Sequence, residues 1–208
     1  FEGAGVFGQI GSWLKYEAYA ASGMDGSKFN ALNGFRDGRQ KERPGMGAPA
    51  FTGRVDFFPL AETVTKIPQE LRLGLSVYAG GLNNGNRGKN PGVDGTLWLP
   101  AADFEYRLGR VDFRGEFAYG RITQPDALRN NAAAEILGWS AEVAGHVLPK
   151  SLKRGKLSEA DLVLFGRFDA YDTQFRMPAG VARDPAGDRR DATFGVSFYP
   201  VRNFVVKA

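Results

Sequence analysis

The single histidine of the chain, His146, lies in a stretch that also carries a serine and a carboxylate. Ser140 and Glu142 precede it in LGWSAEVAGHV. A serine, a histidine and an acid are the groups of a nucleophilic hydrolase, and an outer-membrane lipase would need the serine and the histidine on its lipid-facing side. Ser140 and His146 instead share the polar side of the stretch with Glu142. We therefore expect no catalytic residues and no enzymatic activity.

Two glycine-rich stretches have partial nucleotide-binding spacings. GAGVFG at 3–8 matches G-x-G-x-x-G, which needs a strand before it and a helix after it. QIGSWLKYEA continues a strand pattern there, and GNRGKN lacks the first glycine and the Ser/Thr of a P-loop. The chain has no cysteine, and the acids of its last long polar stretch lack the regular spacing of a calcium loop. We predict no metal ion and no other cofactor.

The elements that must position these groups show a two-residue alternation of charged and apolar side chains. It is clearest in DFEYRLGRVDFRGEFAYG, residues 103–120. A period of two predicts β-strands, because successive side chains point to opposite sides of a sheet. Residues 109–110 can form a two-residue hairpin turn, which places Arg107 opposite Asp112. The other pairs that this register predicts are Glu105 with Arg114, Tyr106 with Phe113, Phe104 with Gly115, Leu108 with Val111, and the like-charged Asp103 with Glu116.

The same alternation recurs along the chain and predicts about ten strands. Long polar connections are expected at 22–49, 81–95, 122–134 and 173–191, with a short helix as an alternative within 126–138. Shorter connections are expected at 12–13, 59–70, 109–110, 149–160 and 200–203. Long and short connections therefore take turns, which is typical of outer-membrane barrels with long outside loops and short periplasmic turns.

Two all-β architectures fit this pattern. In a soluble sheet the aromatic face would pack into a core, whereas in a membrane barrel it would meet lipid and the charged face would line a polar lumen. Most of the runs have about the 9–11 residues with which a tilted strand crosses a bilayer. We predict an antiparallel transmembrane β-barrel, with residues 1–208 forming one domain that is incomplete at both ends.

The net charge of +4 is compatible with anionic partners such as lipopolysaccharide phosphates. The basic run RDGRQKER at 36–43 could bind such phosphates, or could be an ordinary solvated loop. No basic helix or motif of stacking aromatics accompanies it, so we expect no nucleic-acid partner.

Several segments resemble the phosphate-selective porin family. GVFGQIGSWLKYEAYAASG is similar to the strand-turn-strand unit that follows the family's constriction loop, and FTGRVDFFPL with LRLGLSVYAGG resembles the next hairpin. RFDAYDTQ followed by FGVSFYPVRNFVVKA resembles its C-terminal strands. The resemblance implies a sixteen-stranded outer-membrane barrel, usually a homotrimer, that passes small anions such as phosphate. It also implies that the constriction loop lies before residue 1.

Lumen-facing charges are the candidate functional residues of such a wall. The basic candidates are Lys15, Arg54, Arg72, Arg107, Arg114, Arg167 and Lys207. The acidic candidates are Glu17, Asp56, Asp103, Glu105, Asp112, Glu116, Glu142 and Asp169. They could act as a selective ion ladder or as a lining of cross-strand salt bridges. Acids slightly outnumber bases, whereas a strongly anion-selective wall should carry a surplus of arginine and lysine.

The expected function is that of a bacterial outer-membrane porin, a passive channel for small hydrophilic solutes, with anions as expected cargo. Its partners would be outer-membrane lipid and lipopolysaccharide. Two alternatives remain open from the sequence. One is a structural barrel whose lumen holds a partner, such as a sheath around an electron-transfer cytochrome. The other is a soluble β-sandwich that binds a ligand.

Overall fold

The computed structural model describes residues 3–39, 47–83, 94–128, 131–201 and 203–208. Ten antiparallel strands follow one another in a single sheet, and each pairs with its neighbours in the sequence. The strands are β1 (Gly3–Ile10), β2 (Leu14–Ser22), β3 (Pro49–Phe57), β4 (Gln69–Gly81), β5 (Thr96–Leu108), β6 (Val111–Ile122), β7 (Glu135–His146), β8 (Asp161–Arg176), β9 (Asp188–Val201) and β10 (Phe204–Lys207).

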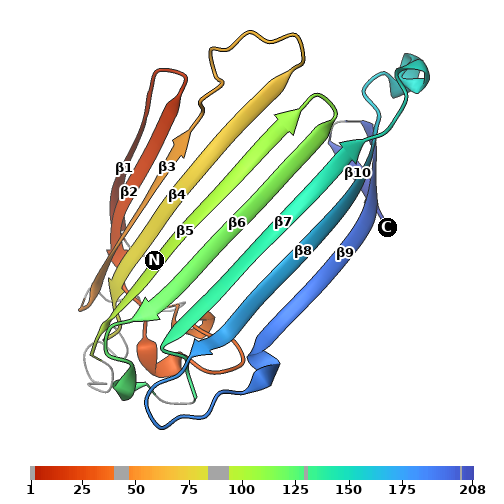
Figure 1. Cartoon of the computed structure of the whole chain (residues 1–208). Helices are drawn as coiled ribbons and strands as arrows, with labels where there is room; N and C mark the ends of the chain where they lie inside the picture. Colours follow the sequence, from red (N-terminus) through yellow and green to blue (C-terminus); the bar gives the residue numbers. More distant parts are fainter. Residues whose placement is uncertain (1–2, 40–46, 84–93, 129–130, 202) are drawn as a thin grey trace.

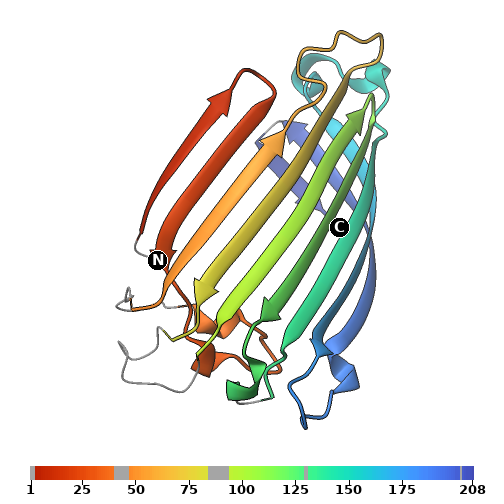
Figure 2. The same cartoon turned by 60° about the vertical axis from the view of Figure 1, so that its left-hand side comes forward.

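The sheet curls around one side without closing. Figure 1 shows its convex face, and Figure 2 shows β8–β10 curving behind β3–β6. The first and last strands, β1 and β10, form its two edges. The chain is therefore all-β, with the form of part of a barrel wall. Among the described residues, no helix has the length and apolar character needed to cross a membrane.

The predicted hairpin register is confirmed. Arg107 lies opposite Asp112 across β5 and β6, and each of the other predicted pairs is also found. The alternation of connection lengths holds only in part. The connections that follow β2, β4, β6 and β8 lie at the lower end of the sheet in Figure 1 and include the longest one, 23–48. The connections at the upper end include the short turns 11–13 and 109–110, but 147–160 is longer than 123–134 or 177–187 at the lower end. We call the lower end the long-connection end and the upper end the short-connection end.

Two expectations about the connections are wrong. The helix considered within 126–138 is only a 3-10 turn, Pro125–Ala127, and β7 begins at Glu135. The last long connection is shorter than expected, because β8 continues to Arg176 and β9 begins at Asp188. The residues at the ends of these strands are polar. The alternation of apolar and charged side chains therefore does not show where the strand pairing ends.

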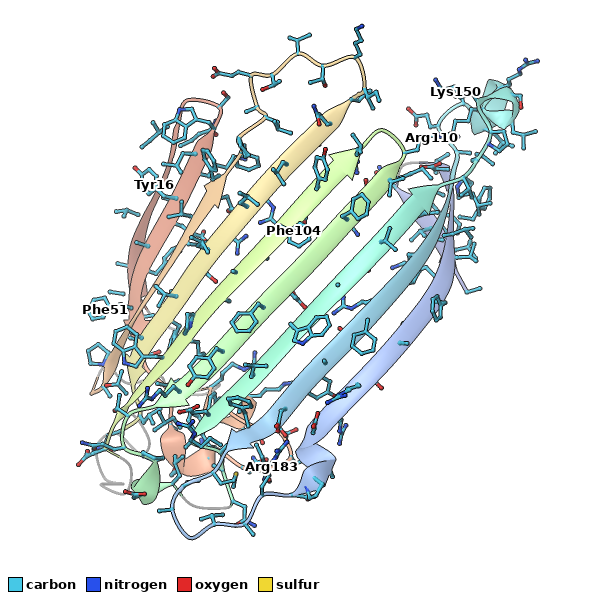
Figure 3. All side chains as sticks on the ribbon, in the orientation of Figure 1. Tyr16, Phe51, Phe104, Arg110, Lys150 and Arg183 are labelled. Atoms are coloured by element: carbon cyan, nitrogen blue, oxygen red, sulfur yellow. The ribbon has the colours of Figure 1, made fainter. Side chains whose placement is uncertain are left out.

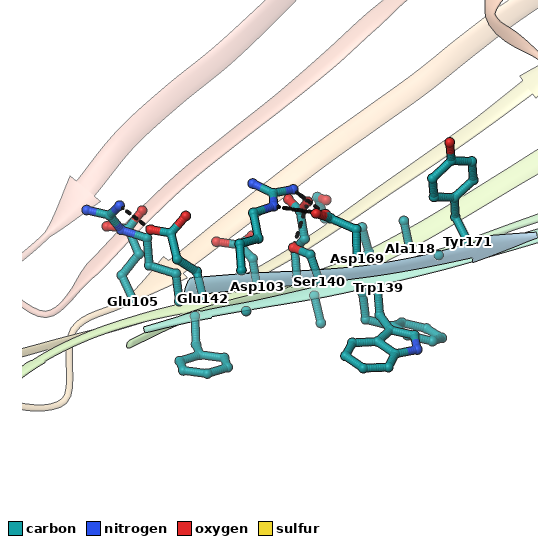
Figure 4. A pocket seen from close by; sticks show the side chains of 18 of the residues that line it. Asp103, Glu105, Ala118, Trp139, Ser140, Glu142, Asp169 and Tyr171 are labelled. Atoms are coloured by element: carbon teal, nitrogen blue, oxygen red, sulfur yellow. Dashed lines mark hydrogen bonds and ion pairs between the residues drawn. The ribbon is translucent and has the colours of Figure 1, made fainter. Parts of the chain in front are cut away.

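The two faces of the sheet differ sharply in chemistry. The convex outer face carries large apolar side chains that are exposed, for example Leu75 at 64% and Phe104 at 40% (Figure 3). The concave face, called the polar face below, carries the charges. The close view in Figure 4 shows the carboxylates of Asp103, Glu142 and Asp169 on one side of the ribbon and the Trp139 ring on the other.

The buried core of the chain lies on the polar face, at the long-connection end. There residues 23–38, the inner segment, fold against the sheet and contribute Phe29, which is fully buried, and Phe35. These rings pack with buried residues of the sheet and its connections, namely Leu82, Leu97, Ile122 and Ala132. The outer face has no such cover among the described residues.

Candidate functional site

The centre of the polar face is held by a network of ion pairs that joins β3, β4 and β5. Arg54 contacts Asp56 at 2.7 Å and Asp103 at 2.8 Å, and Arg72 contacts Asp56 at 2.8 Å. Arg72 also pairs with Asp103, and reaches Glu105 at 3.1 Å. Two arginines thus share two aspartates, and a salt-bridge lining of this kind stiffens the wall while its charges largely compensate one another.

A second group of ion pairs continues across β6, β7 and β8. Arg167 contacts Asp169 at 2.7 Å and Glu116 at 3.4 Å, while Arg114 contacts Glu142 at 2.9 Å. The register prediction had placed Glu105 opposite Arg114, and it is opposite, but Arg114 pairs with the strand on its other side. Glu142 on β7 is also directly opposite Arg114, so register alone does not decide which of the two carboxylates the arginine contacts.

His146 lies at the short-connection end between two carboxylates. Its Nε2 atom is 3.2 Å from Asp112, and its Nδ1 atom contacts Asp161. Lys153 reaches Asp161 at 3.2 Å. Ser140 is elsewhere on the face and donates its hydrogen bond to Glu116 at 3.1 Å. The structure therefore does not assemble a Ser-His-acid triad from these residues.

A hollow lies on the polar face among the side chains of the charged network. Four small residues form its floor and lie in register on β4–β7: Ser76, Ala101, Ala118 and Gly138. The hollow measures about 670 Å³ and is bordered by Arg54, Arg72, Arg167 and Tyr171, among others. Small side chains at these positions leave open space along a wall that is otherwise filled by long charged side chains.

Backbone hydrogen bonds anchor the start of the inner segment and join its two ends to each other. Gly23 donates to the Ala48 carbonyl at 2.9 Å, Asp25 to that of Gly38 at 2.8 Å, and Gly26 to that of Leu82 at 2.9 Å. A Cβ atom at Gly120 would lie only 2.7 Å from a ring atom of Phe35, so glycine allows the close approach.

The middle of the inner segment extends far across the polar face. Ala31 and Leu32 border a hollow of about 240 Å³ whose opposite wall includes Tyr171, Gln174 and Arg189 of β8 and β9. The segment thus leaves the sheet after β2 and reaches residues six strands away. It occupies the concave side of the sheet at the long-connection end.

All of the lumen-facing candidates from the sequence lie on the polar face by register. Four further charged residues of this face were missed: Glu70 opposite Arg107, Asp161 opposite Tyr199, Arg189 opposite Tyr171, and Asp191 opposite Asp169. They stand at strand ends that the short sequence runs did not include. Adding them to the seven basic and eight acidic candidates gives eight bases and eleven acids among the described strand residues.

Two stretches singled out in the sequence lie partly or wholly outside the described residues. Residues 40–43 of the basic run 36–43 and the stretch GNRGKN are not among the described residues. GAGVFG forms most of β1 and leads into the turn before β2, so no helix follows it. Within the described residues, no group of three or more histidine, aspartate or glutamate side chains is arranged to hold a metal ion.

The fold and the two-faced wall define an open antiparallel all-β sheet with a charged concave side. No protein-family model matches the chain, and no solved structure matches it. An uncharacterised protein of Aquifex aeolicus (strain VF5) is 27% identical over 220 residues, which cover 99% of this chain and 47% of that relative. The chain therefore spans about half the length of the curated relative it matches.

Proposed function

We propose that the chain is part of the wall of a bacterial outer-membrane channel through which small hydrophilic solutes diffuse. The observation that supports this proposal is the distribution of side chains between the two faces. Large apolar residues such as Leu75 and Phe104 are exposed on the convex face, while ion-paired charges and a hollow occupy the concave one. Lipid outside and water inside satisfy both faces, whereas water on both sides would leave the apolar band exposed.

The charges on the polar face bear on whether such a channel would favour cations or anions. The resemblance to phosphate-selective porins implies anions, but eleven acids against eight bases on the polar face favour cations. The arginines that would bind phosphate, such as Arg54 and Arg167, are already paired with carboxylates. We therefore propose a general diffusion channel, and the anion preference stays a prediction of the resemblance.

The direct test is ion current through the full-length protein in a planar bilayer under a salt gradient, with phosphate titrated in. Steady conductance supports the channel, and the sign of the reversal potential reports whether cations or anions are preferred. Block by low phosphate would support the phosphate-selective interpretation. A folded, membrane-inserted protein without conductance would contradict the open channel and favour a structural barrel that holds a partner.

A further inference from the structure

The outer face carries a groove at the long-connection end that combines apolar side chains with arginines. The groove measures about 440 Å³ and lies over β7, β8 and β9. Ala170 lies in register between Trp139 and Arg190, so its small side chain leaves a depression between an aromatic ring and a guanidinium group. The groove is also bordered by Leu137, Phe168, Phe175 and Arg183, and by the carboxylates of Asp172 and Asp188.

The apolar part of this groove is open to its surroundings. Trp139 and Phe168 pack against each other with their ring centroids 5.5 Å apart, yet both keep about two fifths of their surface exposed. Phe175 is 45% exposed next to them. Aromatic rings in such a position accept an acyl chain, and a tryptophan near the edge of an apolar band is typical of a membrane interface.

The arginines of the groove have donors to spare. The side chain of Arg190 is 71% exposed, and its carboxylate partner Asp188 is 3.9 Å away. Arg183 contacts Asp172, which is largely buried beneath it, and lies 3.6 Å from Asp188, yet it still exposes 46% of its own side chain. The guanidinium group binds phosphate in a bidentate manner, which suits it to a lipid headgroup.

The surface next to the groove also carries exposed arginines that pair with a buried carboxylate. Arg121 and Arg176 point outward from the ends of β6 and β8 and flank the buried carboxylate of Glu135, at 3.8 and 3.1 Å. Both arginine side chains are more than 60% exposed. Of the carboxylates here, Glu135 and Asp172 are buried and Asp188 is 42% exposed, so the exposed charge where the apolar band ends is mainly positive.

We propose that this groove binds a phosphate-bearing lipid, with an acyl chain along Trp139 and Phe168 and the phosphate at Arg183 and Arg190. Charge complementarity selects this occupant, because an uncharged lipid would leave the arginine donors unused and a free anion would leave the apolar floor uncovered. The proposal rests on the membrane placement given under the proposed function. Long loops of outer-membrane barrels face outward, so the lipid would belong to the outer leaflet.

Trp139 provides a direct readout of occupancy. In full-length protein with Trp13→Phe and Trp98→Phe, Trp139 is the one tryptophan left among those of this chain, and any tryptophan elsewhere in the full-length protein would be replaced likewise. We would reconstitute it in vesicles containing brominated phosphatidic acid or, separately, phosphatidylcholine with the same brominated chains. Quenching should occur at an about tenfold lower mole fraction of phosphatidic acid, the preference expected from charge-assisted hydrogen bonds to phosphate.

Two variants of the groove and one control make the test specific. Arg183→Gln with Arg190→Gln should abolish the preference, and Arg190→Gln alone should weaken it without removing the partner of buried Asp172. Arg189→Gln is the matched control, because Arg189 is adjacent in sequence but lies on the polar face. Circular dichroism would establish that each variant is folded.

The outcomes separate the two proposals. Equal quenching by both lipids would overturn the lipid site while leaving the membrane wall intact. If adding inorganic phosphate abolished the preference for phosphatidic acid, the groove would be a site for free anions. That result would also overturn the lipid site. No quenching by either lipid would show that the outer face is not in contact with lipid, and would contradict the proposed function itself.

Discussion

Phe29 is the most completely buried aromatic side chain of the described chain, although it lies in a connection rather than in a strand. Its ring packs against Phe35 at a centroid distance of 4.9 Å, and no part of it is exposed. Its neighbour Leu32, in the same segment, is 80% exposed. At the residue scale, the attachment of the inner segment therefore depends on a few rings.

We expect Phe29→Ala to release the inner segment from the polar face, because removing a buried phenyl group costs about 3–5 kcal/mol. Limited proteolysis of the folded protein should then cut within 23–38 much faster than in the unchanged protein. Leu32→Ala is the control, and its cleavage rate should stay close to that of the original. Equal protection of the two variants would contradict the role given to Phe29.

The inner segment as an element covers part of the concave side at the long-connection end. The resemblance to porins implies a constriction before residue 1, which stays a prediction. In the described residues, the segment that folds inward is 23–38. Under the proposed function, solutes would pass between this segment and the rest of the lumen, and its size would limit what can pass.

Replacing residues 26–37 by a short glycine-serine linker should raise single-channel conductance and admit larger uncharged polymers. The physical reason is that the segment occupies lumen space without contributing to the pairing of the strands. Polymer-exclusion measurements in planar bilayers would show the change. A linker of the same length in place of part of the 59–68 connection is the control, and an equal rise there would argue against a constriction at 23–38.

At the scale of the whole molecule, the decisive property is the environment of the outer face. Leu75 lies at the middle of β4 on that face, and Ser76 follows it on the polar face. If lipid surrounds the convex side, an arginine at position 75 is buried in hydrocarbon, whereas an arginine at position 76 meets water.

Leu75→Arg should therefore destabilise the reconstituted protein by about 2–4 kcal/mol, the cost of an arginine at the bilayer midplane. Ser76→Arg should change the unfolding free energy far less. Urea titration in vesicles, followed by tryptophan fluorescence, measures both. If Leu75→Arg were as stable as Ser76→Arg, the outer face would be exposed to water, and the soluble-sheet alternative would gain support.

The sequence by itself determined the strands, the side of each strand on which a residue lies, and the hairpin register from Phe104 opposite Gly115 to Leu108 opposite Val111. These properties are local, since they follow from a two-residue period and from turn residues that fix the pairing of adjacent strands. The lumen-facing candidates could be named for the same reason.

Only the tertiary structure decided which groups meet at a distance in the sequence. Arg114 pairs with Glu142 instead of Glu105, His146 lies between Asp112 and Asp161, and the inner segment reaches β8. Each contact depends on the curvature of the sheet or on a choice between two neighbouring strands, and neither leaves a period in the sequence. The outer groove at Ala170 likewise exists only because three strands and the turn at Arg183 come together.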